Sequence, residues 1–198
     1  MYSSTLSENL ESLDDVVRNS LLKLARDTIT AAFTHDTHAP LEAMERNESH
    51  LPSILIEPHP CFVSLFGPRE RLRGCIGRLQ SDEKLYEGVF HMTREAAFHD
   101  PRFRPVQKEE IDRLTIHISV LGPPEPLTDF SKITIGRHGL SVTHDGRRGV
   151  LLADVAKRMN WTREEFLSQT CLKADLSPEN FRAYQWSAFT EIHFSEEP

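Results

Sequence analysis

The spacing of apolar residues predicts both helices and strands along the chain. Helices are predicted over residues 13–33, 83–98, 108–114 and 163–173. Ser81 is expected to cap the second helix, and Thr162 with Glu165 forms a capping box at the last. Residues 34–60 have little periodicity and are rich in proline and charge, so they predict a long connection with one short strand at 54–56.

Alternating or continuous apolar runs predict strands over residues 61–67, 72–79, 114–120, 139–144, 148–152 and 184–194. The first two strands are separated by a spacing that suits a hairpin, and Asp145-Gly146 predicts a second hairpin. The proline-rich stretch 122–127 predicts a loop or crossover. Because strands and helices do not alternate regularly, the order favours an α+β fold with a mainly antiparallel sheet packed with helices.

Composition limits the class of protein. The chain has 198 residues and a formal net charge of −7, which predicts one large domain or two small ones and does not favour broad nucleic-acid binding. Its three cysteines form no CxxC, so neither a disulfide framework nor a cysteine-based zinc site is predicted. The polar, acidic start and the lack of a long apolar run predict no membrane segment and a cytoplasmic protein.

Positive charge is concentrated between residues 69 and 78, where four arginines stand against the single Glu70. Strict alternation along a strand would place Arg71, Arg73, Cys75 and Gly77 on one face. A guanidinium beside Cys75 favours the thiolate, which suits a nucleophile, a redox thiol or a soft ligand.

The glycines of this segment allow two interpretations. Gly74 and Gly77 weaken a strand, so they indicate the close approach of a ligand or of another backbone. Alternatively, Cys75 packs as a small apolar residue and the glycines accommodate a bulge or a helix crossing. Both interpretations remain open on sequence alone.

The segment 98–105 is the second candidate. In an extended conformation Arg102 and Arg104 share a side, so the segment could form the second wall of an anion pocket, with His99 or Asp100 available for proton transfer. The alternative is that Asp100 organises a turn while Phe103 anchors the loop in the core. A metal-binding interpretation of the histidines in residues 35–59 is not favoured because their spacing is irregular, and no metal site is predicted.

Several motifs carry a resemblance to a known family: LRGCIG at 72–77, AAFHDPRF at 96–103, ISVLGPPEPL at 118–127 and GRHGL at 136–140. The chain resembles the AMMECR domain family as a single domain over 1–198, most clearly over 61–194. The resemblance implies an α+β body with a larger and a smaller subdomain and a cleft between them. It also implies a pathway shared with MEMO-like and radical SAM proteins, without an assigned reaction or an identified cofactor.

Two functions of different kinds follow from these observations. One is an enzyme that acts on a small anionic or carbonyl substrate, and the other is a non-catalytic module that binds a ligand or partner in the same cleft. The predicted site has Cys75 as the reactive group, surrounded by Arg71, Arg73, Gly74, Gly77, Asp100, Arg102 and Phe103. Nucleic-acid binding is a third, less favoured interpretation, because the basic cluster is short and lacks interleaved aromatic residues.

Overall fold

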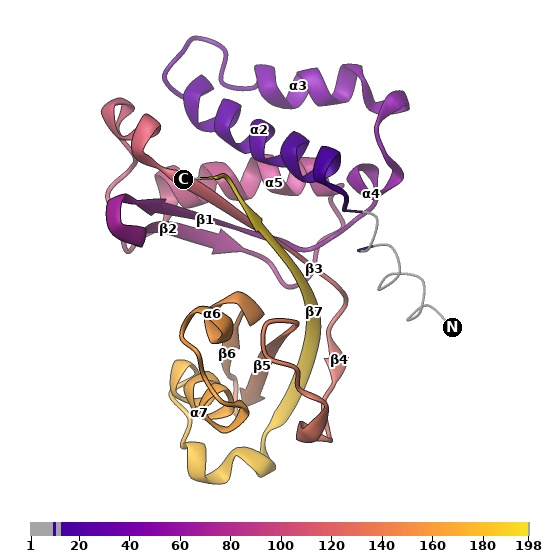
Figure 1. Cartoon of the computed structure of the whole chain (residues 1–198), viewed down its shortest axis with the longest axis vertical. Coiled ribbons are helices and arrows are strands. Elements are labelled where there is room, and N and C mark those ends of the chain that lie inside the picture. Colours follow the sequence, from indigo (N-terminus) through magenta and orange to yellow (C-terminus); the bar gives the residue numbers. More distant parts are fainter. Residues whose placement is uncertain (1–9, 11–12, 198) are drawn as a thin grey trace. The chain divides into compact units, whose positions relative to one another are not determined.

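The computed structural model describes residue 10 and residues 13–197. The chain forms two compact units (Figure 1). Unit 1 contains Met1–Val120 and His193–Pro198, and unit 2 contains Leu121–Ile192. The acidic N-terminal segment, including Ser12 of the predicted helix start, lies largely outside the described residues.

The helices of unit 1 are α2 (Asp15–Ala31), α3 (Ala39–Arg46), α4 (Ser53–Ile56) and α5 (Leu85–Arg94), the last continued by a π-helical turn (Glu95–His99). Short 3-10 helices occupy Glu48–His50, Pro68–Glu70 and Lys108–Arg113. The long helix predicted over 13–33 is confirmed, and the Asp14 side chain caps it by accepting the Val17 N–H at 2.9 Å.

Two predictions about helices of unit 1 are wrong. The stretch 34–60 contains α3 and α4, and the apolar run at 54–56 is one helical turn whose Ile54 and Leu55 are each 1% exposed. A short apolar run fits a buried helical turn as well as a strand, and packing against α5 decides between them. The N-cap of α5 is Lys84, whereas the Ser81 hydroxyl accepts the Glu83 N–H at 3.1 Å.

The sheet of unit 1 has the antiparallel order β2-β1-β3, made of β1 (Cys61–Gly67), β2 (Arg71–Gly77) and β3 (Thr115–Leu121). A β-bulge interrupts the β1–β2 register: Leu65 pairs with Gly74, but Phe66 pairs with Leu72. Arg73 is therefore an extra residue, and the strict alternation predicted along this strand does not hold.

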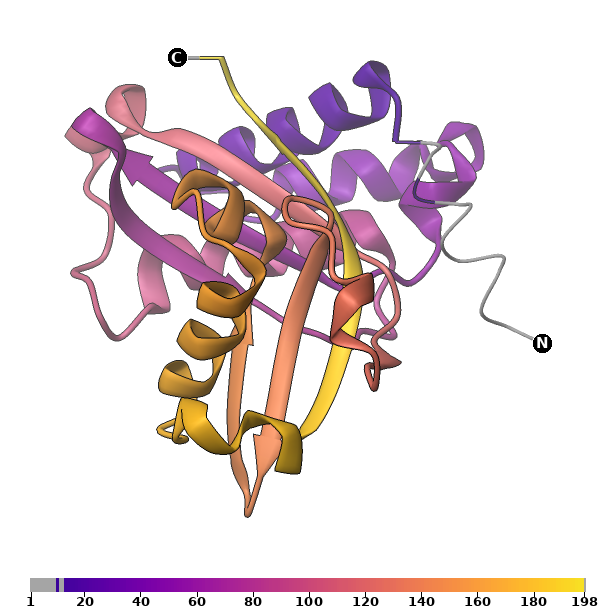
Figure 2. The same ribbon diagram turned by 60° about the horizontal axis from the view of Figure 1, so that its bottom comes forward.

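Helices cover one face of the unit 1 sheet. Helix α5 packs on β1 and β2, and α2 packs on α5, as Figures 1 and 2 both show. The inward side chains Val63, Leu65, Ile116 and Ile118 are fully buried at 0% exposure. Opposite this face, Ser64 pairs with Cys75 on one side and with His117 on the other.

Unit 2 has its own antiparallel strands in the order β6-β5-β7-β4, covered by α6 (Ala153–Arg158) and α7 (Arg163–Lys173). The strands are β4 (Glu125–Pro126), β5 (His138–His144), β6 (Arg147–Leu151) and β7 (Gln185–Ser195), of which the last three residues of β7 belong to unit 1. Short 3-10 helices occupy Phe130–Lys132 and Pro178–Ala183. The predicted hairpin turn is confirmed, with positive φ at Asp145 and Gly146.

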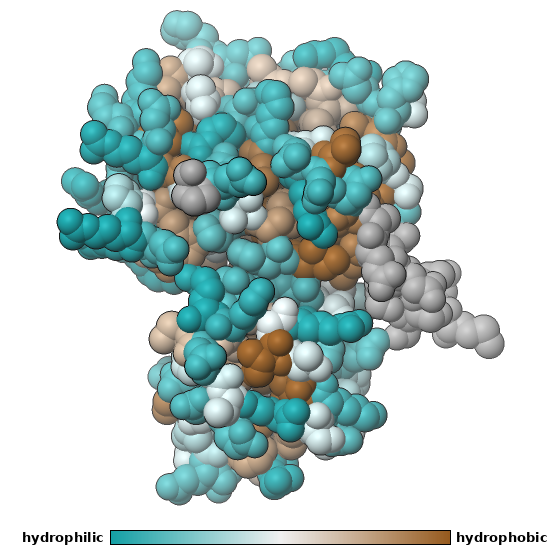
Figure 3. Space-filling view, viewed as in Figure 1, coloured by the Kyte–Doolittle hydropathy of each residue, from teal (hydrophilic) through white to brown (hydrophobic). Residues whose placement is uncertain are grey.

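The predicted α+β class, with a mainly antiparallel sheet packed with helices, is confirmed. Hydrophilic side chains cover most of the surface that Figure 3 shows of each unit. Among the described residues, no helix combines the length and the apolar character that crossing a bilayer requires.

Candidate functional site

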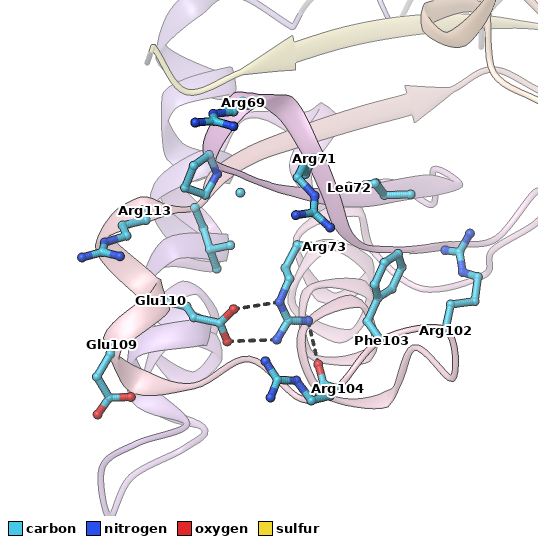
Figure 4. A pocket seen from close by; sticks show the side chains of 13 residues that line it. Arg69, Arg71, Leu72, Arg73, Arg102, Phe103, Arg104, Glu109, Glu110 and Arg113 are labelled. Carbon is cyan, nitrogen blue, oxygen red and sulfur yellow. Dashed lines mark hydrogen bonds and ion pairs between the residues drawn. The ribbon is translucent and has the colours of Figure 1, made fainter.

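A cavity of about 810 Å³ opens beside the β1–β2 turn of unit 1 (Figure 4). Arginines dominate its lining: Arg69, Arg71, Arg73, Arg102, Arg104 and Arg113. Glu109 and Glu110 are the acidic lining residues. The apolar part of the wall comes from Pro68, Leu72, Phe103 and Leu114. The lining therefore combines an excess of positive charge with apolar side chains.

Arg73 is fully engaged in holding the cavity wall together. Its guanidinium contacts both carboxylate oxygens of Glu110 at 2.9 Å and donates to the carbonyl oxygens of Arg104 and Pro105 at 2.6 and 3.1 Å. The attraction of Arg73 lowers the pKa of Glu110 from its ordinary value, so the pair is charged at neutral pH. Arg73 thus ties β2 to the segment 104–110 and neutralises Glu110.

Three of the other arginines have no such partner. The side chains of Arg69, Arg71 and Arg113 make no hydrogen bond or ion pair to another described residue. The side chain of Arg104 also lies close enough to Glu110 to lower its pKa, but Arg73 already occupies that carboxylate. Six guanidiniums against the carboxylates of Glu109 and Glu110 leave the lining of the cavity with an excess of positive charge.

The turn between β1 and β2 is held in an unusual conformation. Arg69 and Glu70 have φ values of 60° and 54°, in the left-handed region that favours glycine. Each such residue costs roughly 1 kcal/mol or more. The turn carries Arg69, which lines the cavity together with Arg113 from the 3-10 helix Lys108–Arg113 (Figure 4).

Asp100 and Arg102 form a clamp on the backbone of Cys75. The Asp100 carboxylate accepts the Cys75 N–H at 2.9 Å and pairs with Arg102 through two contacts of 2.9 and 2.7 Å. Arg102 in turn donates to the Cys75 carbonyl oxygen at 2.9 Å. Arg102, followed by the backbone N–H groups, lowers the pKa of Asp100 to about 2 even though burial opposes the shift. Because Asp100 stays ionised, it suits positioning better than proton transfer.

The thiol of Cys75 lies on the side of β2 that faces Ser64. The Ser64 hydroxyl donates to the Sγ atom of Cys75 at 3.1 Å, and Cys75 is half-buried. Cys61 and Cys171 are buried, and burial raises the pKa of both thiols, that of Cys61 to about 12. Among the described residues, the lining of the cavity includes Arg71 and Arg73 but not Cys75.

The glycines of β2 accommodate protein atoms. A Cβ at Gly74 would lie 2.0 Å from the carbonyl oxygen of Ala96, and a Cβ at Gly77 would lie 2.1 Å from the ring of Phe62. Of the two interpretations that the sequence left open, close packing against another backbone accounts for Gly74. Packing against an aromatic ring accounts for Gly77.

The structure brings only part of the predicted set to the cavity: Arg71, Arg73, Arg102 and Phe103. The other four predicted residues do not line it: Asp100 binds the Cys75 backbone, and Gly74 and Gly77 pack against Ala96 and Phe62. Two lining arginines were missing from the prediction, Arg69 and Arg113. Arg69 belongs to the arginine-rich segment 69–78, whereas Arg113 lies in a segment with no such signal. The sequence placed Arg104 on the same side of the second candidate segment as Arg102, and both line the cavity.

No group of three or more histidine, cysteine or carboxylate side chains within the described part of the chain is arranged to hold a metal ion. His99 is the other residue that the sequence suggests for proton transfer. Its Nδ1 atom lies 3.3 Å from Oε1 of Glu95.

Comparison with known proteins places the chain among relatives of similar length. The family model AMMECR1 matches residues 22–194. A protein of Thermococcus kodakarensis is 40% identical over 192 residues, which cover 90% of each chain. A protein of Methanothermobacter thermautotrophicus is 37% identical over 180 residues, 85% of this chain and 90% of the relative. The crystal structure of an uncharacterized protein from Pyrococcus horikoshii matches with a TM-score of 0.74 and 34% identity, covering 89% of this chain and 90% of that one.

Proposed function

Since the chain belongs to the AMMECR1 family, and membership of this family implies no particular reaction, we propose a function from the candidate site. The arginine-lined cavity of unit 1 binds a small molecule that carries more than one negative charge. The observation that carries the proposal is the set of unpaired guanidiniums of Arg69, Arg71 and Arg113 around one cavity of about 810 Å³. Guanidiniums bind phosphate and carboxylate groups through paired, charge-assisted hydrogen bonds.

The net charge of the protein makes this cluster more informative. The chain carries a formal charge of −7, so a cavity with six arginines and two glutamates runs against the overall balance. Gathering like charges in one cavity destabilises the folded protein unless an anion compensates them. A bound anion relieves the repulsion among the arginines. The same attraction therefore provides the affinity for the anion and stabilises this region of the folded protein.

Calorimetric titration with inorganic phosphate and pyrophosphate tests the proposal. We expect pyrophosphate to bind more tightly than phosphate, and the affinity to fall as salt rises, because exposed charges are screened. The variant Arg71→Gln should weaken pyrophosphate binding about tenfold, since it removes one charge-assisted hydrogen-bonding group.

Arg148→Gln is the matched control because Arg148 is an exposed arginine on β6 of unit 2. This variant should bind pyrophosphate as the unchanged protein does. The proposal fails if pyrophosphate does not bind, or if both variants weaken binding equally.

Catalysis by Cys75 is the second candidate function. It is supported by the half-buried thiol, the Ser64 hydroxyl at 3.1 Å and the clamp of Asp100 and Arg102 that fixes the backbone. Arg102 also lines the cavity, so one side chain contacts both the cavity and the cysteine backbone. An enzyme of this kind would act on a small anionic or carbonyl compound bound near the arginines.

Native mass spectrometry of the purified protein tests this second candidate. A covalent adduct on the unchanged protein that is absent from Cys75→Ala, while pyrophosphate affinity stays the same, would support catalysis by the thiol. Loss of pyrophosphate binding in Cys75→Ala would instead assign Cys75 to the structure of the cavity wall.

The predicted partners from the family resemblance, MEMO-like and radical SAM proteins, remain a proposal about the pathway. Co-purification of this chain with either protein from the same cells tests it directly. Recovery of neither protein under conditions that preserve weak complexes would count against a physical association.

A further inference from the structure

We infer that the ligand of the cavity carries an aromatic ring next to its anionic group, with the ring against Phe103 and the anion among the arginines. The inference rests on the proposed function and names the class of its ligand: a phosphate or carboxylate attached to a flat ring. It follows from the apolar part of the cavity lining, which anion binding alone leaves unexplained.

The size of the cavity is the first argument. Cavities of about 300–1,000 Å³ hold drug-sized organic ligands. At about 810 Å³, this cavity has room for a ring system in addition to a phosphate group. A site built only for an inorganic anion needs a smaller space whose polar groups converge on one point.

The second argument is the exposure of apolar side chains that line the cavity. Leu72 is 39% exposed and, with Val16, Phe33, Ile56, Met159 and Leu172, is among the exposed large apolar side chains of the described residues. It lines the cavity together with the half-buried Phe103 and the exposed Pro68, whereas Leu114, the remaining apolar lining side chain, is 6% exposed. Removing this apolar surface from water favours binding only when the ligand is itself partly apolar.

The position of Phe103 is the third argument. Its ring is half-buried and stands between the Arg102 side chain and the group of Arg71 and Arg73 (Figure 4). The Arg102 guanidinium carbon lies 5.3 Å from the ring centroid. A ring held by a cation in this way gives a rigid platform for a second ring, while nearby guanidiniums remain available for its anionic substituent.

The sequence had left open whether Phe103 anchors its loop in the core. The adjacent Asp100 fulfils the positioning role through its hydrogen bonds to Cys75 and Arg102. Phe103 is half-buried and does not belong to the buried core, so part of its side chain is open to contact a ligand.

A matched pair of phosphate esters tests the inference. Phenyl phosphate and methyl phosphate carry the same anionic group, and at pH 8 both hold two negative charges because the second pKa of such phosphates is about 6. We expect phenyl phosphate to bind about tenfold more tightly, the preference typical of one stacked ring. In Phe103→Leu the two affinities should approach each other, because leucine keeps an apolar side chain but offers no ring.

Phe33→Leu is the control, because Phe33 is 37% exposed and packs against Phe98 outside the cavity. It should keep the preference for phenyl phosphate. The inference is overturned if the two esters bind equally to the unchanged protein, or if Phe103→Leu keeps the full preference. The proposed anion-binding function fails separately, when neither ester binds and pyrophosphate does not bind either.

Discussion

The carboxylate of Asp100 accepts the backbone N–H of Cys75 at 2.9 Å, across 25 positions of sequence. Arg102 completes the connection by binding both the carboxylate and the Cys75 carbonyl oxygen. The loop after α5 is therefore attached to β2 through the main chain of the cysteine, independently of the sulfur. Loss of the carboxylate should affect stability even where it leaves the thiol chemistry intact.

Asp100→Asn should lower the free energy of unfolding at neutral pH by about 2 kcal/mol, the value of a shift from the usual 3.8 to a pKa of about 2. Because the pKa of Asp100 is lower in the folded protein, its stabilising effect is present above about pH 4 and is lost as the pH falls towards 2. Urea unfolding of both proteins at several pH values between 2 and 7 measures this difference.

Asp82→Asn is the control for this change, because Asp82 is exposed and makes no contact with the clamp. It should unfold like the unchanged protein across the same pH range. A difference between Asp100→Asn and the unchanged protein that stays constant down to pH 2 would show that charge is not its cause.

Gly74→Ala should destabilise the protein by about 2 kcal/mol or more, because the new Cβ would lie 2.0 Å from the Ala96 carbonyl oxygen and the backbone must move. Gly67→Ala is the matched variant: the nearest atom to its Cβ would be 3.9 Å away. Thermal unfolding compares the two, and equal melting temperatures would contradict the close contact.

Arg73→Lys should also destabilise unit 1, although it keeps the charge. A lysine ammonium cannot hold both oxygens of Glu110 and the carbonyl oxygens of Arg104 and Pro105 in the same planar arrangement. We expect a loss of about 1–3 kcal/mol in chemical unfolding. Arg78→Lys, at an exposed pair with Glu83, should change little, and similar losses in the two variants would refute a special role for Arg73.

Alkylation of the folded protein should modify Cys75 well before the other two cysteines. Cys61 and Cys171 are buried, and burial raises the pKa of both, so each holds less thiolate and is harder to reach. Peptide mass spectrometry during reaction with iodoacetamide near pH 7.5 follows each site. If Cys61 reacts as fast as Cys75, the assignment of Cys75 as the accessible thiol is wrong.

The sequence predicts the secondary structure well where one pattern dominates. The capping box at Thr162 and Glu165 begins α7 as expected, and Asp145-Gly146 forms the predicted hairpin turn. It fails at 54–56, where a short apolar run allows two structures and only burial against α5 selects the helix. Propensity and periodicity are local, so they cannot anticipate that selection.

The candidate site is predicted only in part for a similar reason. Alternation predicts Arg71, Arg73 and Cys75 on one face of β2, but it cannot reveal the bulge at Arg73, and of the three only the arginines line the cavity. The contribution of Arg113 depends on the packing of a 3-10 helix beside the turn. Partners that meet only in three dimensions leave no trace in the spacing of a single sequence.

The bulge at Arg73 also limits how this strand tolerates insertions and deletions. Removing one residue from the turn at 68–70 would shift the pairing of β2 by one position, and a shift by one exchanges the two faces of a strand. The sulfur of Cys75 would then point at α5. A residue with a side chain would replace Gly74 opposite the Ala96 carbonyl oxygen. Length variation in this hairpin is therefore compatible with folding only in steps of two residues, or where a second bulge restores the phase.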